Sequence, residues 1–233
     1  SMNIKSVCIV GGGSSGWMTA AALSKLCPHL EITLVESKKV KTVGVGESTL
    51  GHINKFLDML DLKDEDWMAE CNATYKNSIQ FTNFRDGNGE VFQYPFVQGY
   101  DFTDANNGLD TWGELATLYP EEFPPETFSE MYAPTNTFLA KHNKQSNNLD
   151  KSLRHYSFKY DTAYHMDAAL FGQYLKDKIA IPNGVTHMYK DVHSYVKDSQ
   201  GNILQILCDD GHNLKADLWI DCTGFQSILL KAG

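Results

Sequence analysis

The sequence has 233 residues, with 20 lysines and arginines against 29 aspartates and glutamates, which gives a formal net charge of −9. Hydrophobic residues make up 42% and charged residues 21%, a composition typical of a globular protein with a sizeable core. The acidic balance argues against a general nucleic-acid binder and against a polybasic membrane-surface protein. No apolar run reaches the roughly 18 residues of a membrane-spanning helix. The five cysteines are an odd number without metal-knuckle spacing, so we expect reduced thiols and a cytoplasmic location.

The first forty residues predict a strand, a glycine-rich turn, a helix and a second strand in immediate succession. Residues 6–10 form a short β-branched apolar run, and residues 11–16 match the pattern Gly-x-Gly-x-x-Gly directly after it. A helix is expected from Trp17 to Leu26, because Pro28 cannot continue it. The next apolar run, residues 32–35, ends at Glu36, twenty residues after the last glycine of the pattern.

This order of elements is typical of a dinucleotide-binding βαβ unit, although the glycines alone would also suit a turn that binds nothing. The first glycine permits a tight turn, the second lets the backbone approach a pyrophosphate, and the third lets helix and strand pack closely. The phosphates would lie at the helix N-terminus, whose N–H groups favour an anion. The carboxylate at the end of the second strand would accept hydrogen bonds from a ribose diol. An acid at this position disfavours a 2′-phosphate, so the pattern favours NAD or FAD over NADP. The residues assigned to this site are Gly11, Gly13, Ser14, Ser15, Gly16, Trp17 and Glu36.

A second glycine cluster, residues 43–49, follows a basic stretch and precedes a helical pattern. Apolar residues recur at helical spacing between Leu50 and Leu60, so we expect a helix whose N-cap is Ser48 or Thr49. The glycines of the cluster would let the backbone lie flat against a planar ligand. A capped loop without a ligand explains the same residues.

The next segment places a lysine between two predicted elements. The acidic residues 64–66 begin a helix that we expect to run towards Tyr75, and residues 78–84 and 90–94 predict a hairpin around the turn at 85–89. Lys76 would therefore lie at a helix-to-strand junction, which suits a side chain aimed into a cleft. On the residue pattern alone, a solvated surface lysine is the ordinary interpretation.

The middle and the C-terminal third differ in pattern. Residues 92–165 are rich in aromatic residues and proline, which suits either the wall of an aromatic substrate site or the packing of a strand-poor insertion.

Asp167 then predicts a helix N-cap. Residues 192–196 and 203–208 predict a hairpin, and residues 218–220 predict a last parallel strand. His165 and His193 have no triad or metal spacing and are interpreted as structural.

Five patches in this order resemble the flavin-dependent tryptophan halogenases. They are the Gly-x-Gly-x-x-Gly-Trp-Met turn with its Ala-rich helix, the Val-Gly-Val-Gly-Glu-Ser-Thr cluster, and residues 71–81, 164–168 and 217–225. The resemblance implies an α/β, FAD-binding two-dinucleotide-fold, with a Rossmann-like βαβ unit, a parallel sheet and a β-meander. Residues 2–91 and 166–233 would form the FAD-binding domain, and residues 92–165 an aromatic-rich insertion on the substrate side.

The resemblance also implies an oxidoreductase activity and its site. Reduced FAD, O2 and halide would give hypohalous acid, which Lys76 would deliver to an aromatic substrate. The cluster at 43–49 would be the family's flavin strap, and a separate NADH-dependent flavin reductase would supply reduced FAD; a homodimer is compatible with the family. Further cofactor contacts are assigned to Gly46, Glu47, Ser48, Val192 and Asp221, and substrate contacts to Tyr94 and Phe96.

The sequence departs from the family in two respects. Tyr94 stands where the family has histidine, so the resemblance favours an aromatic or heteroaromatic, indole-like substrate without specifying tryptophan. Family members are roughly twice as long, so we expect the C-terminal part of the family, with its second catalytic residue, to be absent and the chain alone to bind FAD without halogenating. An FAD-dependent monooxygenase or other FAD oxidoreductase, and a non-catalytic FAD-binding fragment, are the alternatives.

Overall fold

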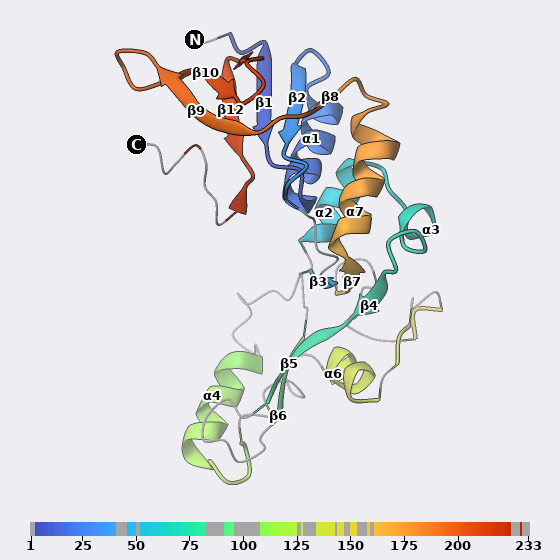
Figure 1. The fold of residues 1–233 in the computed structure, drawn as a ribbon. Helices are drawn as coiled ribbons and strands as arrows, with labels where there is room; N and C mark the ends of the chain where they lie inside the picture. Colours follow the sequence, from blue (N-terminus) through green and yellow to red (C-terminus); the bar gives the residue numbers. More distant parts are fainter. Residues whose placement is uncertain are drawn as a thin grey trace. The chain divides into compact units, whose positions relative to one another are not determined.

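The computed structural model describes residues 3–40, 46–49, 52–82, 91–95, 108–124, 127, 134–142, 144–146, 150–152, 158, 161–224 and 229. Figure 1 labels most of their helices and strands. Their contacts divide the chain into two units. Unit 1 comprises Ser1–Glu47, Phe56–Ala73 and Met166–Gly233, and unit 2 comprises Ser48–Lys55 and Thr74–His165. The domain boundaries inferred from the sequence stay a prediction.

Unit 1 is built on a parallel sheet, which confirms the predicted α/β class. The sheet has four strands in the order β12-β1-β2-β8. Ile9 in β1 lies between Leu34 in β2 and Ile220 in β12, and all three pairings in the sheet are parallel. The predicted strands at 6–10, 32–35 and 218–220 are therefore confirmed. The full bounds are β1 Ser6–Val10, β2 Glu31–Glu36, β8 Thr186–Tyr189 and β12 Leu218–Asp221.

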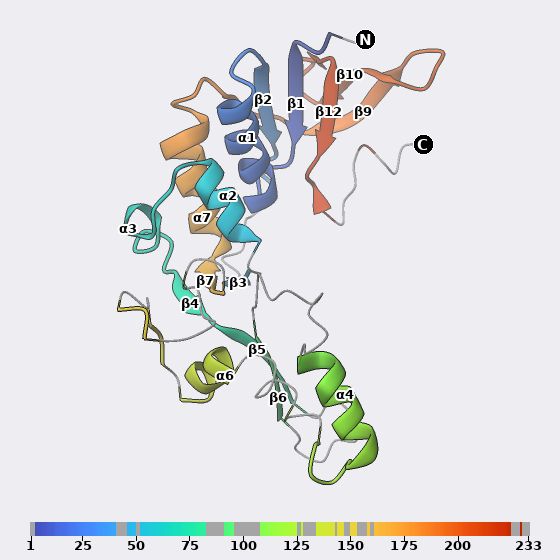
Figure 2. The ribbon, with the colours of Figure 1, turned by 180° about the vertical axis from the view of Figure 1, so that it is seen from behind.

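Both faces of this sheet are covered, because side chains alternate along each strand and both sets are apolar. On one face, Leu34 packs against α1 (Ser14–Leu26), which lies beside α7 (Ala168–Leu175) and the π-helix η1 (Lys176–Ala180). On the other face, Cys8, Val10 and Val35 form a core cluster with side chains of a β-meander. Figures 1 and 2 show the helices and the meander on opposite sides of the sheet.

The meander has the strand order β11-β10-β9 and is antiparallel throughout. It consists of β9 (Val192–Lys197), β10 (Ile203–Cys208) and the short β11 (Leu214–Lys215). The predicted hairpin of β9 and β10 is confirmed, and Asp198 fixes its turn by accepting hydrogen bonds from the backbone N–H groups of Gln200 and Asn202. The predicted N-cap of α7 is also confirmed, because the Asp167 carboxylate accepts a hydrogen bond from Leu170 N.

Three predicted helices differ from those observed. α1 begins at Ser14, three residues before the expected start at Trp17. α2 spans Ile53–Met59 and so begins later than the expected start near Leu50. α3 is only Asp64–Trp67, and the prediction that it runs towards Tyr75 is wrong. Asn72 adopts a left-handed φ of 50°, which asparagine tolerates and a helix does not, and the chain then enters strand β4 (Thr74–Lys76).

In unit 2, β4 pairs antiparallel with β7 (Ala163–Asp167), so that Lys76 lies opposite Ala163. The predicted hairpin is confirmed by the antiparallel pairing of β5 (Ser78–Thr82) with β6 (Val91–Pro95). Its predicted turn at 85–89 lies outside the described residues. Unit 2 also contains α4 (Gly108–Leu118) and α6 (Pro134–Lys141), which packs on the hairpin. The short strand β3 (Gly46–Ser48) begins in unit 1 and ends at the first residue of unit 2.

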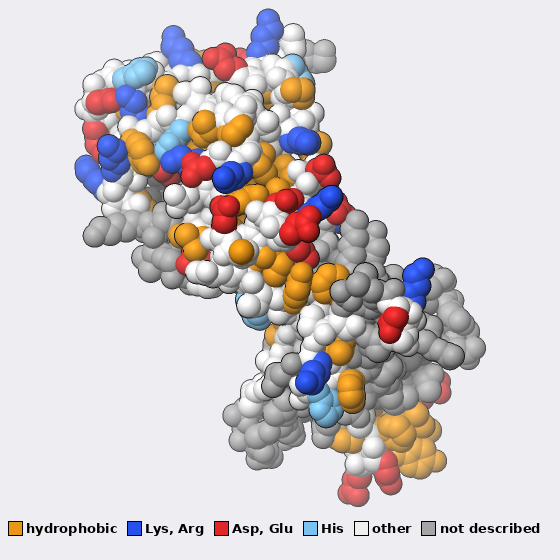
Figure 3. Space-filling model, turned by 90° about the vertical axis from the view of Figure 1, so that its right-hand side faces the viewer, with side chains coloured by type: hydrophobic (Ala, Val, Ile, Leu, Met, Phe, Trp, Pro, Cys, Tyr) orange, Lys and Arg blue, Asp and Glu red, His pale blue; other side chains and the backbone are white. Residues whose placement is uncertain are grey.

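The described surface carries charges of both signs. Acidic and basic side chains are interspersed on the face of the molecule shown in Figure 3. Within the described ranges, none of the helices combines the length and the apolar character needed to cross a membrane.

Candidate functional site

Unit 1 contains a cavity of about 380 Å³ at the carboxyl ends of the parallel strands. This is the edge of an α/β sheet at which ligands bind, and the volume lies in the range of small-molecule sites. The chain reaches the cavity as it leaves β1, β2, β8 and β12. The lining residues are Val10, Gly11, Gly12, Gly13, Val35, Glu36, Ser37, Val40, Lys190, Asp191, Val192, Cys222, Thr223 and Gly224.

Each glycine of the turn is required for a different structural reason. Gly11 has a φ of +118°, and a Cβ there would lie 2.5 Å from the carbonyl oxygen of Cys222. A Cβ on Gly16 would lie 2.0 Å from the carbonyl oxygen of Gly11, so only glycine lets α1 approach the strand this closely. Gly13 lines the cavity, and no atom lies within 4 Å of the place that a Cβ would take, so its open side faces the space that a ligand would fill.

Gly12 is a residue of the site that the motif leaves unspecified. A Cβ on Gly12 would lie 1.1 Å from Oε2 of Glu36. The glycine is therefore needed for the Glu36 carboxylate to lie against the turn. The signal in the sequence was the extra glycine between the first two glycines of the motif, at a position where the motif requires none.

The other residues predicted for this site differ in whether they line the cavity. Ser14 and Ser15 open α1, and its N-cap Gly13 has no side chain to occupy the first N–H groups. Trp17 is 2% exposed and packs in the core, outside the lining. Asp221 is also outside it, but its carboxylate accepts hydrogen bonds from Thr223 N and from Leu229 N, both at 2.9 Å. Asp221 thus holds the turn 222–224 that forms one wall.

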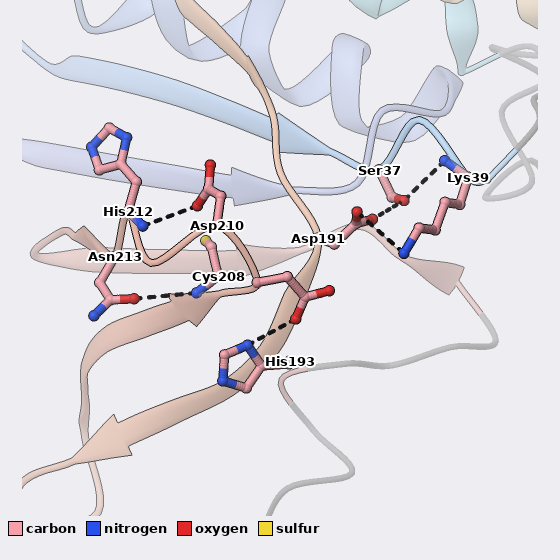
Figure 4. Close-up of polar contacts among 9 residues, drawn as sticks. Ser37, Lys39, Asp191, His193, Cys208, Asp210, His212 and Asn213 are labelled. Atoms are coloured by element: carbon pink, nitrogen blue, oxygen red, sulfur yellow. Dashed lines mark hydrogen bonds and ion pairs between the residues drawn. The ribbon is translucent and has the colours of Figure 1, made fainter.

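A polar group forms the rim at the ends of β2 and β8. The Ser37 hydroxyl donates a hydrogen bond to Asp191, and Lys39 Nζ lies 3.5 Å from the same carboxylate (Figure 4). The hydrogen bond from Ser37, with the charge of Lys39, lowers the pKa of Asp191. The backbone of Val192 follows directly, and Val192 lies in the lining as the prediction requires. The sequence did not indicate Ser37 or Lys39, because they are brought to Asp191 from another strand.

These features fit a dinucleotide. The open face of Gly13, the uncapped start of α1 and the Glu36 carboxylate provide the donors and acceptors that phosphates and a ribose require. Cys222 adds a thiol to the wall, and burial raises its pKa, so the thiol stays protonated and unreactive. Among the described residues, no group of histidine, cysteine and carboxylate side chains is suited to a metal ion.

The second candidate position is Lys76 in unit 2. Lys76 is only 8% exposed. Its Nζ donates hydrogen bonds to Ser48 Oγ and to the carbonyl oxygen of Thr49, the latter at 3.0 Å. Burial lowers the pKa of the amine from its ordinary value. The prediction of a helix-to-strand junction is wrong, because Lys76 is the last residue of a strand.

The backbone of Thr49 is fixed by β7. Thr49 N donates to the carbonyl oxygen of Tyr164 at 2.9 Å, and Tyr164 N donates to Thr49 Oγ1 at 2.9 Å. The expected capping of α2 by Ser48 or Thr49 is therefore wrong: one hydroxyl accepts from Lys76 and the other binds β7. β4 and Thr49 are both held on the same strand, which brings the amine to its acceptors.

His165 lies near this amine. Burial lowers its pKa, and the positive charge of Lys76 lowers it further. At neutral pH the imidazole is therefore neutral, which avoids a second positive charge beside Lys76. Nothing in the sequence pattern links the two residues, which come near each other only through the strand pairing of β4 and β7.

The remaining predicted site residues are only partly described. Gly46 lies in β3, and Glu47 follows it in the same strand, although its side chain is outside the described part. Tyr94 lies in β6 opposite Ile79, also without a described side chain. Phe96 lies outside the described residues.

Comparison with known proteins links the chain to one family. The sequence model of the tryptophan halogenase family matches residues 6–233. The chain is 34% identical to the 7-chloro-L-tryptophan 6-halogenase KtzR of Kutzneria sp. (strain 744), over 96% of the chain and 45% of that protein. It is 32% identical to the tryptophan 7-halogenase RebH of Lentzea aerocolonigenes, over 98% of the chain and 44% of that protein.

Solved structures give the same result. The apo structure of VirX1 matches with 59% identity and a TM-score of 0.87, over 98% of this chain and 44% of that one. Xcc4156, a flavin-dependent halogenase from Xanthomonas campestris, matches with 31% identity and a TM-score of 0.80, again over 98% and 44%. The chain thus spans less than half the length of the relatives that it matches.

Proposed function

Because the chain belongs to the tryptophan halogenase family, we propose that the protein containing it is an FAD-dependent halogenase of aromatic compounds. Bound and reduced, FAD would supply the chemistry that turns O2 and halide into hypohalous acid. The protein's part is to hold the coenzyme, to keep water away from the oxidant and to deliver electrophilic halogen to carbon.

The cavity of unit 1 supplies the residues that would hold FAD. The N–H groups at the start of α1, next to Gly13, would bind the pyrophosphate. Glu36 would accept hydrogen bonds from the adenosine ribose, and the backbone at Val192 would lie against adenine. Gly46, Glu47 and Ser48 are proposed to contact the flavin as the strap.

The buried, hydrogen-bonded position of Lys76 is the main observation that supports the proposal. A lysine that is 8% exposed, with a lowered pKa and two hydrogen-bond acceptors, differs from the usual solvated lysine. The protonated amine would donate a hydrogen bond to the oxygen of hypohalous acid and polarise the oxygen–halogen bond. The free amine would instead form a nitrogen–halogen bond and release water. Burial lowers the pKa of the amine, which brings the free form closer to neutral pH than in a solvated lysine, and it keeps the reagent away from bulk solvent.

The finer assignments follow the same family. We propose an aromatic or heteroaromatic, indole-like substrate contacted by Tyr94 and Phe96, with halide as co-substrate. A separate NADH-dependent flavin reductase would supply reduced FAD. The five cysteines are all unpaired, which supports a reducing, cytoplasmic location. A homodimer stays a prediction.

The test uses the natural full-length protein with a flavin reductase, FAD, NADH and halide. A panel of indoles and other electron-rich aromatics is screened by mass spectrometry for a halogen isotope pattern. We expect a halogenated product, and we expect Lys76→Met to lower its rate by at least about 100-fold while FAD affinity is unchanged.

Lys55→Met is the matched control, because Lys55 is an exposed lysine of the same unit. Full activity of Lys76→Met would contradict the role of this amine. Hydroxylated product without halogenated product would favour an FAD-dependent monooxygenase, and failure of the natural protein to bind FAD would contradict the proposal altogether.

A further inference from the structure

The Glu36 carboxylate has a partner that belongs to neither the glycine motif nor the cavity lining. His187 Nε2 lies 3.0 Å from Glu36 Oε1, and the two side chains are only 11% and 18% exposed. His187 lies on β8, which pairs with β2 in the parallel sheet. The histidine therefore reaches the carboxylate from the neighbouring strand, behind the wall of the cavity.

Aromatic neighbours fix the imidazole. Its ring lies edge-on to Trp17, with centroids 5.1 Å apart, and to Tyr189, with centroids 4.6 Å apart. Trp17 is itself buried on the inner side of α1. The ring is thus held between two larger rings with Nε2 directed at the carboxylate, and this orientation depends on packing as well as on the hydrogen bond.

The protonation state suits a donor. Burial lowers the pKa of His187, and so does the Lys176 ammonium, which together outweigh the opposing effect of Glu36 and Asp177. The neutral imidazole with its proton on Nε2 donates to Oε1 and leaves the negative charge on Glu36. The second oxygen, Oε2, lies against Gly12, where a Cβ would be 1.1 Å away. The carboxylate is therefore held at one oxygen by a donor and at the other by a close backbone surface.

We propose that His187 is a positioning residue that fixes Glu36 for recognition of the adenosine ribose hydroxyls. The proposal rests on the FAD site proposed above and deepens it. A free glutamate has several rotatable bonds and would lose conformational entropy when it binds a ribose. A carboxylate already held by His187 has lost that freedom before the ligand arrives, so the pair His187–Glu36 contributes both affinity and preference for the 2′-hydroxyl.

The experiment measures FAD affinity of the natural full-length protein by flavin fluorescence. We expect His187→Leu to weaken FAD binding about tenfold, because the loss of one hydrogen bond to a charged group typically has an effect of this size. His187→Gln, whose amide can donate from a similar position, should recover most of the affinity. In a Glu36→Ala background His187→Leu should have no further effect, because the group that it positions is gone.

A second measurement reports ribose recognition directly. ADP and 2′-deoxy-ADP compete with FAD, and the ratio of their dissociation constants gives the preference for the 2′-hydroxyl. We expect this ratio to fall towards one in His187→Leu and to stay near the native value in His187→Gln. A histidine that only stabilises the fold would change the affinity for both competitors equally and leave their ratio unchanged.

His193→Leu is the matched control. His193 is another histidine paired with a carboxylate, with Nδ1 3.0 Å from Asp209, but it is 52% exposed and outside the cavity lining (Figure 4). Should His187→Leu not fold, His187→Asn replaces it, because the shorter asparagine amide keeps a polar group but does not extend to the position of Nε2 beside Glu36. We expect the competitor ratio to fall towards one in His187→Asn, and a native ratio in this folded variant would overturn the positioning role.

The outcomes separate the two proposals. If the native protein does not bind FAD, the FAD site itself is wrong. If it binds FAD but His187→Leu has an unchanged competitor ratio, or has the same effect in the Glu36→Ala background as with the native carboxylate, the positioning role of His187 is wrong and the FAD site stands.

Discussion

The cavity of unit 1 and the lysine of unit 2 are built in different ways. The cavity is formed largely by backbone at strand ends, and its key residues are glycines whose role is to leave space. The lysine position is formed by side chains and carbonyls from separate segments, held on a common strand. The first site is therefore sensitive to added atoms, and the second to removed ones. The predictions below test this difference, beginning with the largest expected effect.

Adding one methyl group at Gly16 should destabilise unit 1, because the new Cβ would lie 2.0 Å from the backbone carbonyl of Gly11. We expect Gly16→Ala to lower the free energy of unfolding by about 3 kcal/mol, measured by denaturant unfolding. Gly113→Ala is the control, since Gly113 is also a helical glycine but has open space at the Cβ position. It should be neutral or stabilising by up to about 1 kcal/mol. Equal effects of the two changes would refute the close approach.

Adding the same group at Gly13 should affect binding and spare the fold. No atom lies within 4 Å of a Cβ placed there, and the residue lines the cavity. We expect Gly13→Ala to keep the native thermal midpoint and to weaken FAD binding at least about tenfold, because the backbone could no longer approach the pyrophosphate closely. Isothermal titration with FAD and a thermal melt of the same sample check both parts. Unchanged affinity would show that the pyrophosphate lies elsewhere.

Removing the amine of Lys76 should increase stability although it abolishes the proposed activity. Burial lowers the pKa of this amine in the folded protein below its ordinary value in the unfolded chain. At any pH between these two pKa values, the unfolded chain therefore binds more protons than the folded protein. Stability therefore rises with pH across that window. We expect Lys76→Met to remove this slope and to raise the thermal midpoint by about 2–4 °C near neutral pH.

The measurement is a series of thermal melts between about pH 7 and pH 10, with Lys55→Met as the exposed control. A lower midpoint in Lys76→Met at every pH would mean that the lysine is retained for stability, and the comparison between the two sites would lose its basis.

The smallest effect is expected at Ser48, an acceptor of the Lys76 hydrogen bond. Ser48→Ala removes a group that favours the charged amine, so the pKa of Lys76 should fall further. The amine should then react with trinitrobenzenesulfonate at a lower pH than in the native protein, as read by peptide mass spectrometry. Ser152→Ala, at an exposed serine of the same unit, should leave the profile unchanged. An upward shift in Ser48→Ala would show that the hydroxyl does not accept from the ammonium.

Local patterns in the sequence were sufficient for much of the fold. The strands at 6–10 and 218–220, the cap at Asp167 and the two hairpins follow from alternation, capping and turn residues that lie within a few positions of one another. Where a local signal was extended too far, as for the helix after residue 64, a left-handed Asn72 precedes the strand that replaces it.

The sequence by itself determined the βαβ unit, its glycine turn and the acid that follows it, because each is encoded by neighbouring residues. Only the tertiary structure decided that Glu36 meets His187, that Gly12 must make room for that carboxylate, and that Lys76 is buried against Ser48. These pairs come together through strand pairing and register between distant segments. No local propensity specifies such contacts, since they depend on which strands become neighbours and on how far each is shifted along the other.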